Sequence, residues 1–167
     1  MTTPELESLT ALFRKLGARE PELWAKSQLE ERIPQLSRYL FLRQAWRLIV
    51  GADDDPGWID SYIRNAEAKP DAPYSGSGHA LRSLRARGAT DVELNELVRG
   101  IQAELLFGLC YLLEYPGDVE PEARDIAWAL FRLDEDGRPV EPIAGLHESV
   151  LETDPTGREA RPKEPAG

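Results

Sequence analysis

The sequence is poor in the features that stabilise small secreted proteins or anchor a chain in a membrane. It contains one cysteine, Cys110, so no disulfide can form within the chain, and the disulfide-rich secreted class is excluded. Its main apolar run, Leu105 to Leu113, has nine residues, whereas a transmembrane helix needs about 20. The first residues, MTTPELESL, lack the basic start of a secretory signal. We therefore expect a cytoplasmic protein with no membrane partner.

Recognised catalytic, metal-binding and phosphate-binding motifs are also missing. The pair His147-Glu148 would begin a zinc-binding HExxH helix, but the position of the second histidine is occupied by Leu151. The acidic run Asp134-Glu135-Asp136 is followed at once by Gly137, whereas a calcium-binding EF-hand loop has its glycine in the sixth place. No serine lies in a G-x-S-x-G nucleophile elbow. We therefore predict no metal and no cofactor, and we leave enzymatic activity uncertain, with a non-enzyme favoured.

Negative charge exceeds positive charge by ten, since the chain has 30 acidic and 20 basic residues. Proteins that bind duplex nucleic acid neutralise its phosphates with a basic surface, so we exclude this class of ligand. Residues 32–52 hold four arginines and no acid, whereas residues 118–154 hold eleven acids and three arginines. The acids either pair across the fold or simply face water, or they steer a basic partner protein. The candidate acidic binding surface consists of Asp118, Glu120, Glu122, Asp134, Glu135, Asp136 and Glu141.

One long helix, at about residues 91–115, is predicted at the centre of the protein. The residues from Thr90 to Glu93 form a capping box, which marks a helix start. Apolar residues then recur at spacings of three and four, as on one face of an amphipathic helix. We expect the residues of this stripe to be deeply buried, namely Leu97, Ile101, Leu105, Leu109 and Leu112.

The rest of the chain predicts an all-α bundle of about seven helices in one domain, residues 1–157. Capping residues, prolines and glycines place helices at about 3–16, from 21 to before Pro34, at 35–50, from Pro56, from Ser77 to before Gly88, and at 120–133. Residues near 133–140 are predicted to form either a small hairpin or an irregular loop. A last short helix is expected within 143–151. The tail, residues 158–167, has no apolar pattern and is expected to be disordered.

A second group of polar residues offers an alternative site. His79 follows a serine- and glycine-rich loop whose free N–H groups could bind an anion, although a loop capped by Ser77 explains the same residues. Glu104 lies beside the apolar stripe, either as a rim residue that reaches solvent or an arginine of another helix, or as a general acid or base in a pocket between helices. Cys110 is expected in the core. The alternative pocket or anion site comprises Arg43, Arg47, Ser77, His79, Glu104 and His147.

Three classes of function remain open from the sequence. The favoured class is an acidic helical interaction protein of the immunity or adaptor type, which acts by binding another protein. The alternatives are a small enzyme whose site gathers His79, Glu104 and His147 between helices, and a structural or assembly subunit that forms a homo-oligomer. Sixteen of the 20 basic residues are arginine, a bias that we interpret as that of a GC-rich bacterial genome.

Overall fold

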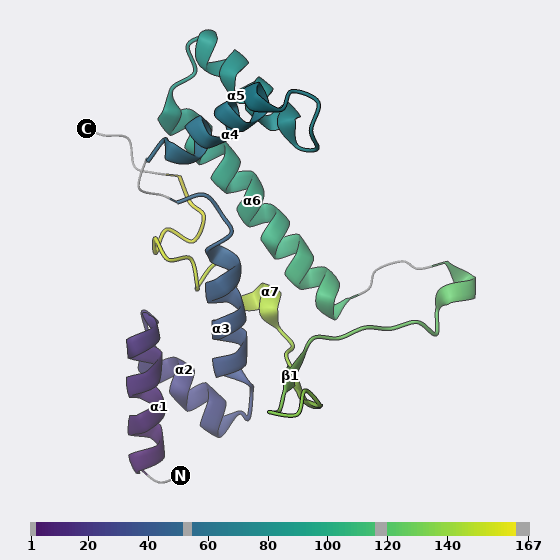
Figure 1. Cartoon of the computed structure of the whole chain (residues 1–167). Helices are drawn as coiled ribbons and strands as arrows, with labels where there is room; N and C mark the ends of the chain where they lie inside the picture. Colours follow the sequence, from purple (N-terminus) through teal and green to yellow (C-terminus); the bar gives the residue numbers. More distant parts are fainter. Residues whose placement is uncertain (1–2, 52–54, 116–119, 163–167) are drawn as a thin grey trace. The chain divides into compact units, whose positions relative to one another are not determined.

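The structure is a computed structural model that describes residues 3–51, 55–115 and 120–162. These residues contain seven α-helices, one 3-10 helix and one two-stranded antiparallel sheet, which confirms the all-α class with a small hairpin (Figure 1). They form two compact units. Unit 1 comprises Met1–Trp46 and Leu106–Glu159, and unit 2 comprises Arg47–Leu105 and Ala160–Gly167. The single domain predicted for residues 1–157 stays a prediction.

The N-terminal part of unit 1 consists of α1 (Thr3–Leu16), α2 (Pro21–Glu30) and α3 (Gln35–Trp46). Gly17, with φ of +91°, ends α1 where the sequence predicts it, because glycine adopts this left-handed conformation without a steric cost. Three aromatic rings from the three helices form the core of this part. Phe13, Trp24 and Tyr39 are buried, and their ring centroids lie 5.3 to 5.9 Å apart.

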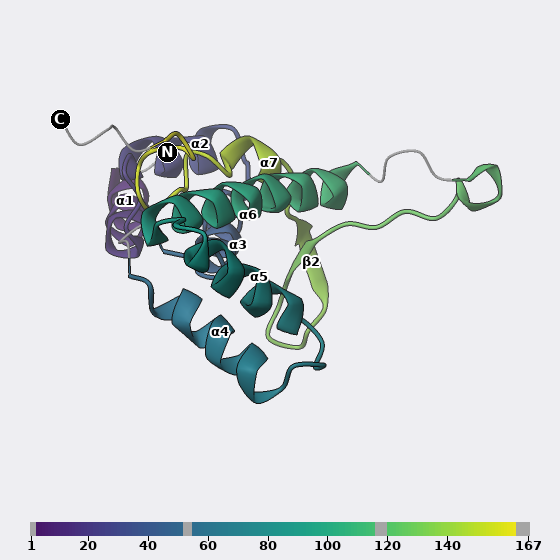
Figure 2. The same ribbon diagram turned by 90° about the horizontal axis from the view of Figure 1, so that it is seen from above.

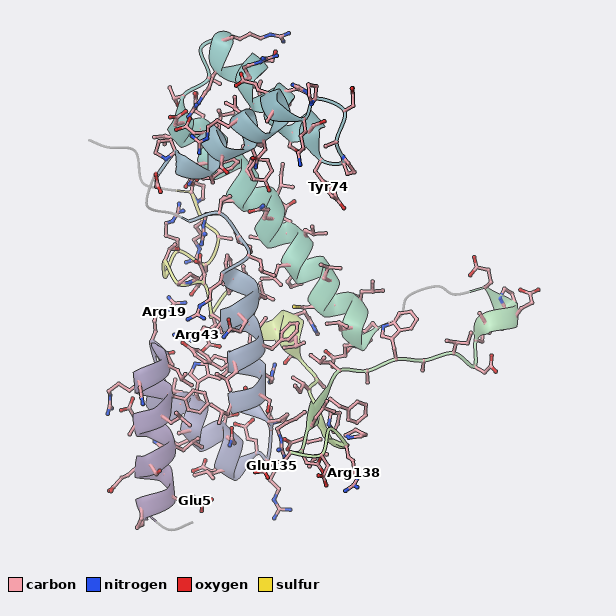
Figure 3. All side chains as sticks on the ribbon, viewed as in Figure 1. Glu5, Arg19, Arg43, Tyr74, Glu135 and Arg138 are labelled. Carbon is pink, nitrogen blue, oxygen red and sulfur yellow. The ribbon has the colours of Figure 1, made fainter. Side chains whose placement is uncertain are left out.

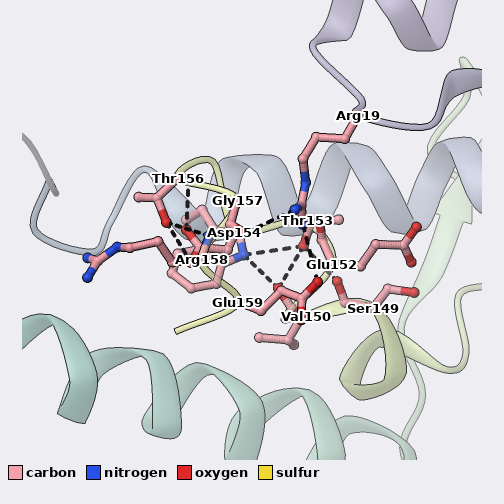
Figure 4. Close-up of polar contacts among 11 residues, drawn as sticks. Arg19, Ser149, Val150, Glu152, Thr153, Asp154, Thr156, Gly157, Arg158 and Glu159 are labelled. Atoms are coloured by element: carbon pink, nitrogen blue, oxygen red, sulfur yellow. Dashed lines mark hydrogen bonds and ion pairs between the residues drawn. The ribbon is translucent and has the colours of Figure 1, made fainter. Parts of the chain in front are cut away.

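The C-terminal segment of unit 1 packs on α3 through α7 (Leu146–Ser149) and the turn that follows it. Trp46 Nε1 donates a hydrogen bond to the carbonyl of Val150, 3.0 Å away. Arg19 Nη2 donates to the carbonyl of Glu152 at 2.6 Å, and Arg19 Nη1 donates to that of Gly157 at 3.1 Å (Figure 4). These contacts hold residues 150–157 against the N-terminal helices, although the segment has almost no regular secondary structure.

Unit 2 is built on the close packing of α4 (Gly57–Ala68) against α5 (Ser75–Ala86), which lie side by side in both ribbon views (Figure 2). Gly78 permits this approach, because a Cβ atom there would lie 2.6 Å from Ala66 Cβ. The core joins these helices to the start of α6 (Asp91–Glu114). It consists of Ile59, Leu81 and Leu94.

The helix α6 is the predicted central helix, and its N-terminal capping box is confirmed. The Thr90 backbone N–H donates to Glu93 Oε2 at 2.8 Å, and the Glu93 N–H donates to Thr90 Oγ1 at 3.2 Å. These bonds from Thr90, through its backbone and its side chain, lower the pKa of Glu93 below its usual 4.5. α6 is one unbroken helix that passes from unit 2 into unit 1 after Leu105.

The helix predicted at residues 120–133 is wrong. The structure has a 3-10 helix, η1 (Pro121–Ala123), followed by extended chain and a hairpin of β1 (Phe131–Leu133) and β2 (Pro139–Pro142). Most residues from 120 to 133 are exposed, so a helix here would have no core on which to bury its apolar face. Tertiary packing supplies most of a helix's stability in proteins. Trp128 instead donates its indole N–H to the carbonyl of Leu112, 2.9 Å away.

Three helix boundaries also differ from the sequence prediction. The helix from Gln35 ends at Trp46 and not at Val50, because side chains of α6 bind the Val50 backbone. Ser77 does not cap α5, which begins at Ser75 after Tyr74 in a left-handed conformation. Asp55 accepts the N–H of Gly57 at 2.9 Å, so its carboxylate acts at the start of α4, which begins one residue later than predicted.

Phe13→Ala is expected to destabilise unit 1 by about 3 to 5 kcal/mol, because it opens a cavity among three aromatic rings. The measurement is urea unfolding followed by tryptophan fluorescence. The control is Leu23→Ala on α2, where the side chain is 55% exposed and the expected change is within about 0.5 kcal/mol. Equal effects of the two substitutions would show that Phe13 is not in the core.

Thr90→Ala is expected to raise the pKa of Glu93 toward 4.5, because it removes the hydroxyl donor and leaves the backbone donor. A lowered carboxyl pKa contributes stability above pH 4.5 that is lost as the pH falls through the folded-state pKa. The loss of stability in acid should therefore be smaller in the variant. NMR titration of the Glu93 side chain in both proteins measures this, and an unchanged pKa would contradict the capping box.

Candidate functional site

The apolar stripe of α6, predicted to be deeply buried, is exposed. We call its members, Leu97, Ile101, Leu105, Leu109 and Leu112, the α6 row. Their exposed fractions are 55%, 58%, 60%, 50% and 44% in that order. Leu94, three residues before Leu97 on the same face, is buried with Ile59 and Leu81. The other buried residues of α6 lie elsewhere around the helix, and they include Asn95, Arg99, Ala103 and Cys110. The prediction of a buried stripe is therefore wrong.

Polar side chains on α6 explain which side of the helix is buried in unit 2. Arg99 Nη1 donates to the carbonyl of Val50 at 2.8 Å, and Gln102 Oε1 accepts the N–H of Val50 at 2.9 Å. Asn95 Nδ2 donates to the carbonyl of Gly51 at 2.9 Å, while Asn95 Oδ1 accepts the indole N–H of Trp58 at 2.9 Å. Buried polar groups without such partners would cost about 1 to 3 kcal/mol each. These bonds therefore hold the polar side of α6 toward the interior of unit 2.

A pocket of about 280 Å³ lies in unit 2 beside the N-terminal half of α6. Its lining is mostly apolar and comes from α4, α5, α6 and Val50. Ser77 is among the lining residues, which are Val50, Trp58, Tyr62, Ser77, Ala80, Leu81, Leu84, Val98 and Gln102. The sequence carries no signal for this pocket, because its walls come from four separate segments.

His147 lies in an aromatic surrounding in unit 1. The rings of Phe107, Tyr111 and Tyr115 have their centroids 5.2 to 6.0 Å from that of His147. Its Nδ1 atom is 3.2 Å from Glu114 Oε2 but lacks the alignment of a hydrogen bond. Sequence reasoning missed these four neighbours, since nothing in the sequence pairs them with His147.

The carboxylate beside His147 also holds the chain before α7. Glu114 Oε2 accepts the N–H of Gly145 at 2.8 Å. Arg38 donates to the carbonyl of Gly145, and its Nη2 lies 3.1 Å from Glu148 Oε2. Gly145 has φ of +68°, and a Cβ atom there would collide with the guanidinium of Arg38. This network therefore joins α3, α6 and α7 within unit 1.

The other residues of the alternative site are divided between the two units. In unit 2, His79 Nε2 lies 3.2 Å from the carbonyl oxygen of Pro70, and Glu104 is exposed. Arg43 is half-buried in α3, and Arg47 is exposed at the start of unit 2. His147, His79 and Glu104 are thus divided between the two units.

Burial makes Cys110 a poor nucleophile. The side chain is 1% exposed, and desolvation raises the pKa of the thiol to about 11. A thiolate, which is the reactive form, is therefore rare at neutral pH. This agrees with the core position expected from the sequence.

The described part of the acidic surface lies in η1 and the hairpin of unit 1, and half of its members are bound locally. Asp134 accepts the backbone N–H groups of Asp136 and Arg138 at 3.0 and 2.9 Å. Two ion pairs, Asp136–Arg138 at 2.9 Å and Glu141–Arg132 at 3.2 Å, lie in the same hairpin. Figure 3 shows Glu135 and Arg138 near its tip. Glu120, Glu122 and Glu135 are exposed, and Asp118 lies outside the described residues.

Within the described ranges, no three His, Cys, Asp or Glu residues gather as a metal ion would require. None of the helices described is both long enough and apolar enough to cross a membrane. No protein-family model, curated protein or solved structure matches this chain.

Arg99→Met is expected to destabilise unit 2 by about 1 to 3 kcal/mol, because it leaves the Val50 carbonyl without its donor. Leu105→Ala should change the free energy of unfolding by no more than about 0.5 kcal/mol when it is measured at low protein concentration, as at other exposed positions. A buried Leu105 would instead cost about 2 to 5 kcal/mol. Denaturant unfolding of both variants decides between the two orientations of α6.

Proposed function

We propose that this protein is an interaction module that binds another protein through the α6 row, in the manner of immunity or adaptor proteins. The observation that carries the proposal is the exposure of all five apolar residues of the row, at 44% to 60%. Monomeric proteins rarely expose large contiguous apolar surfaces, and such surfaces mark sites of association. A helix with an apolar row of this spacing binds by laying the row into a hydrophobic groove of its partner.

The groups considered for catalysis do not all belong to one unit. His79 and Glu104 belong to unit 2, and His147 belongs to unit 1. His147 is surrounded by aromatic rings and Glu114, and the thiol of Cys110 is protonated at neutral pH.

The acidic residues offer weaker support than the α6 row. Asp134, Asp136 and Glu141 bind groups of their own hairpin, which leaves Glu120, Glu122 and Glu135 to act on a partner among the described members of the acidic surface. Long-range attraction of this kind changes association rates and specificity more than affinity. We therefore assign the binding energy to the apolar row and only steering to the acids.

The test is photo-crosslinking in cells with a benzophenone amino acid at Ile101 of the full chain. We expect protein adducts at Ile101, because the row is covered when the protein acts. The control is the same amino acid at Leu48, which is 85% exposed and lies outside α6. Adducts that are no more abundant at Ile101 than at Leu48 would contradict the proposed function.

A further inference from the structure

The pocket of unit 2 has the size and position of a small-molecule site. It lies where α4, α5 and α6 meet the backbone at Val50, and the described residues that line it all belong to unit 2. Spaces between packed helices are common ligand sites, and their walls are mostly apolar. An apolar cavity of about 150 Å³ holds one benzene molecule. In proportion, the volume of about 280 Å³ found here has room for two fused rings, or about ten non-hydrogen atoms.

The walls of the pocket favour an uncharged aromatic ligand. None of the described residues that line it is acidic, basic or a histidine, so a charged ligand would lose its hydration there without meeting an opposite charge. Trp58 and Tyr62 line one wall, with their ring centroids 5.9 Å apart and their planes at 83°. Leu84 of α5 and Val98 of α6 contribute apolar side chains. Flat rings suit such walls, because aromatic pairs stack or meet edge to face.

Gln102 gives the pocket an oriented pair of hydrogen-bond donors. Its Oε1 accepts the N–H of Val50 at 2.9 Å. A backbone N–H can only donate, so this bond shows which end of the amide is the oxygen and leaves Nε2 with two donors. Within the described part of the chain, Nε2 has no acceptor. A ligand atom that accepts a hydrogen bond would provide one.

Two of the side chains that line the pocket are held in place by bonds within unit 2. Arg99 Nη1 donates to the carbonyl of Val50 at 2.8 Å, so α6 binds both polar groups of the residue that orients Gln102. The indole N–H of Trp58 donates to Asn95 Oδ1 at 2.9 Å. Side chains that are already fixed lose little freedom when a ligand binds, and this preorganisation improves affinity.

We propose that this pocket binds a neutral molecule of two fused aromatic rings with one hydrogen-bond acceptor. The acceptor binds Gln102 Nε2, and the rings pack against Trp58 and Tyr62. The inference goes beyond the proposed function, which assigns a protein partner to the α6 row and makes no use of this pocket. Each can therefore fail without the other.

The first test is an NMR titration of the full chain with two probes of equal shape. Quinoline has a ring nitrogen that accepts a hydrogen bond, whereas naphthalene has no acceptor, and the reporter is the indole N–H signal of Trp58. We expect a saturable shift with quinoline and a dissociation constant of about 1 mM or below, as ligands of this size reach. Naphthalene should bind at least about fivefold more weakly, because it leaves the amide of Gln102 without an acceptor.

The second test fills the pocket. Ala80 lines it from α5 and is exposed, so a larger side chain enters the pocket without entering the core. Ala80→Phe should weaken quinoline binding at least about tenfold, because the new ring occupies the space of the ligand. The matched control is Ser83→Phe, which adds the same ring at an exposed position of α5 outside the lining and should change the dissociation constant less than about twofold. Circular dichroism checks that both variants are folded.

The third test changes the amide of Gln102 and keeps its bond to Val50. Gln102→Glu retains an oxygen that accepts the Val50 N–H and replaces both donors with a second acceptor. The preference for quinoline over naphthalene should disappear in this variant. A purely structural role of Gln102 would weaken both probes alike and preserve their ratio.

A folded chain that gives no saturable shift with quinoline would overturn the inference. Equal binding of quinoline and naphthalene by the unsubstituted chain overturns it as well, because the ligand would then need no acceptor. Equal losses in Ala80→Phe and Ser83→Phe would place the ligand elsewhere, with the same consequence.

The proposed function is decided separately, by crosslinking at Ile101. If quinoline does not bind and Ile101 captures a protein, the pocket fails alone. If quinoline binds as expected and Ile101 captures nothing beyond the Leu48 control, the proposed function fails alone.

Discussion

The exposed surface of unit 2 depends on how α6 binds one short piece of backbone. Arg99 and Gln102 satisfy the carbonyl and the N–H of Val50, and Asn95 binds the carbonyl of Gly51. Each is a modest interaction by itself, with a net contribution of about 1 kcal/mol. Together they decide the rotation of the helix about its axis, because a different rotation would leave several buried polar groups without partners. The helix therefore turns Leu97, Ile101 and Leu105 toward solvent, while Leu94 stays in the core.

This rotation creates two opposing demands on the protein. A helix with five exposed apolar side chains gains free energy when another surface covers them. A chain with a net charge of −10 resists non-specific association of its copies through mutual repulsion. The net charge therefore protects the exposed row from non-specific aggregation.

Local signals in the sequence predicted much of the fold. The capping box at Thr90 and the glycine stops at Gly17 and Gly88 were readable because each acts within one helical turn. Local signals of this kind did not predict the candidate site. Hydrophobic periodicity identified the residues of the α6 row but predicted that they are buried. The row is exposed because Arg99 binds Val50, which lies 49 residues earlier in the chain, and no local pattern in the sequence indicates this contact. The sequence singles out His147 as a candidate residue, but it does not predict the aromatic neighbours of His147, because these depend on how α7 packs against α6.

The burial of Cys110 turns the only thiol of the chain into a reporter of motion. A reagent can reach its sulfur only when the C-terminal half of α6 separates from the residues that cover it. The rate of thiol labelling under native conditions therefore measures the free energy of that opening, in the same way as hydrogen exchange does for a backbone amide. No engineered label is needed, because the sequence contains no other cysteine. The helix that carries the α6 row thus also carries a probe of local unfolding.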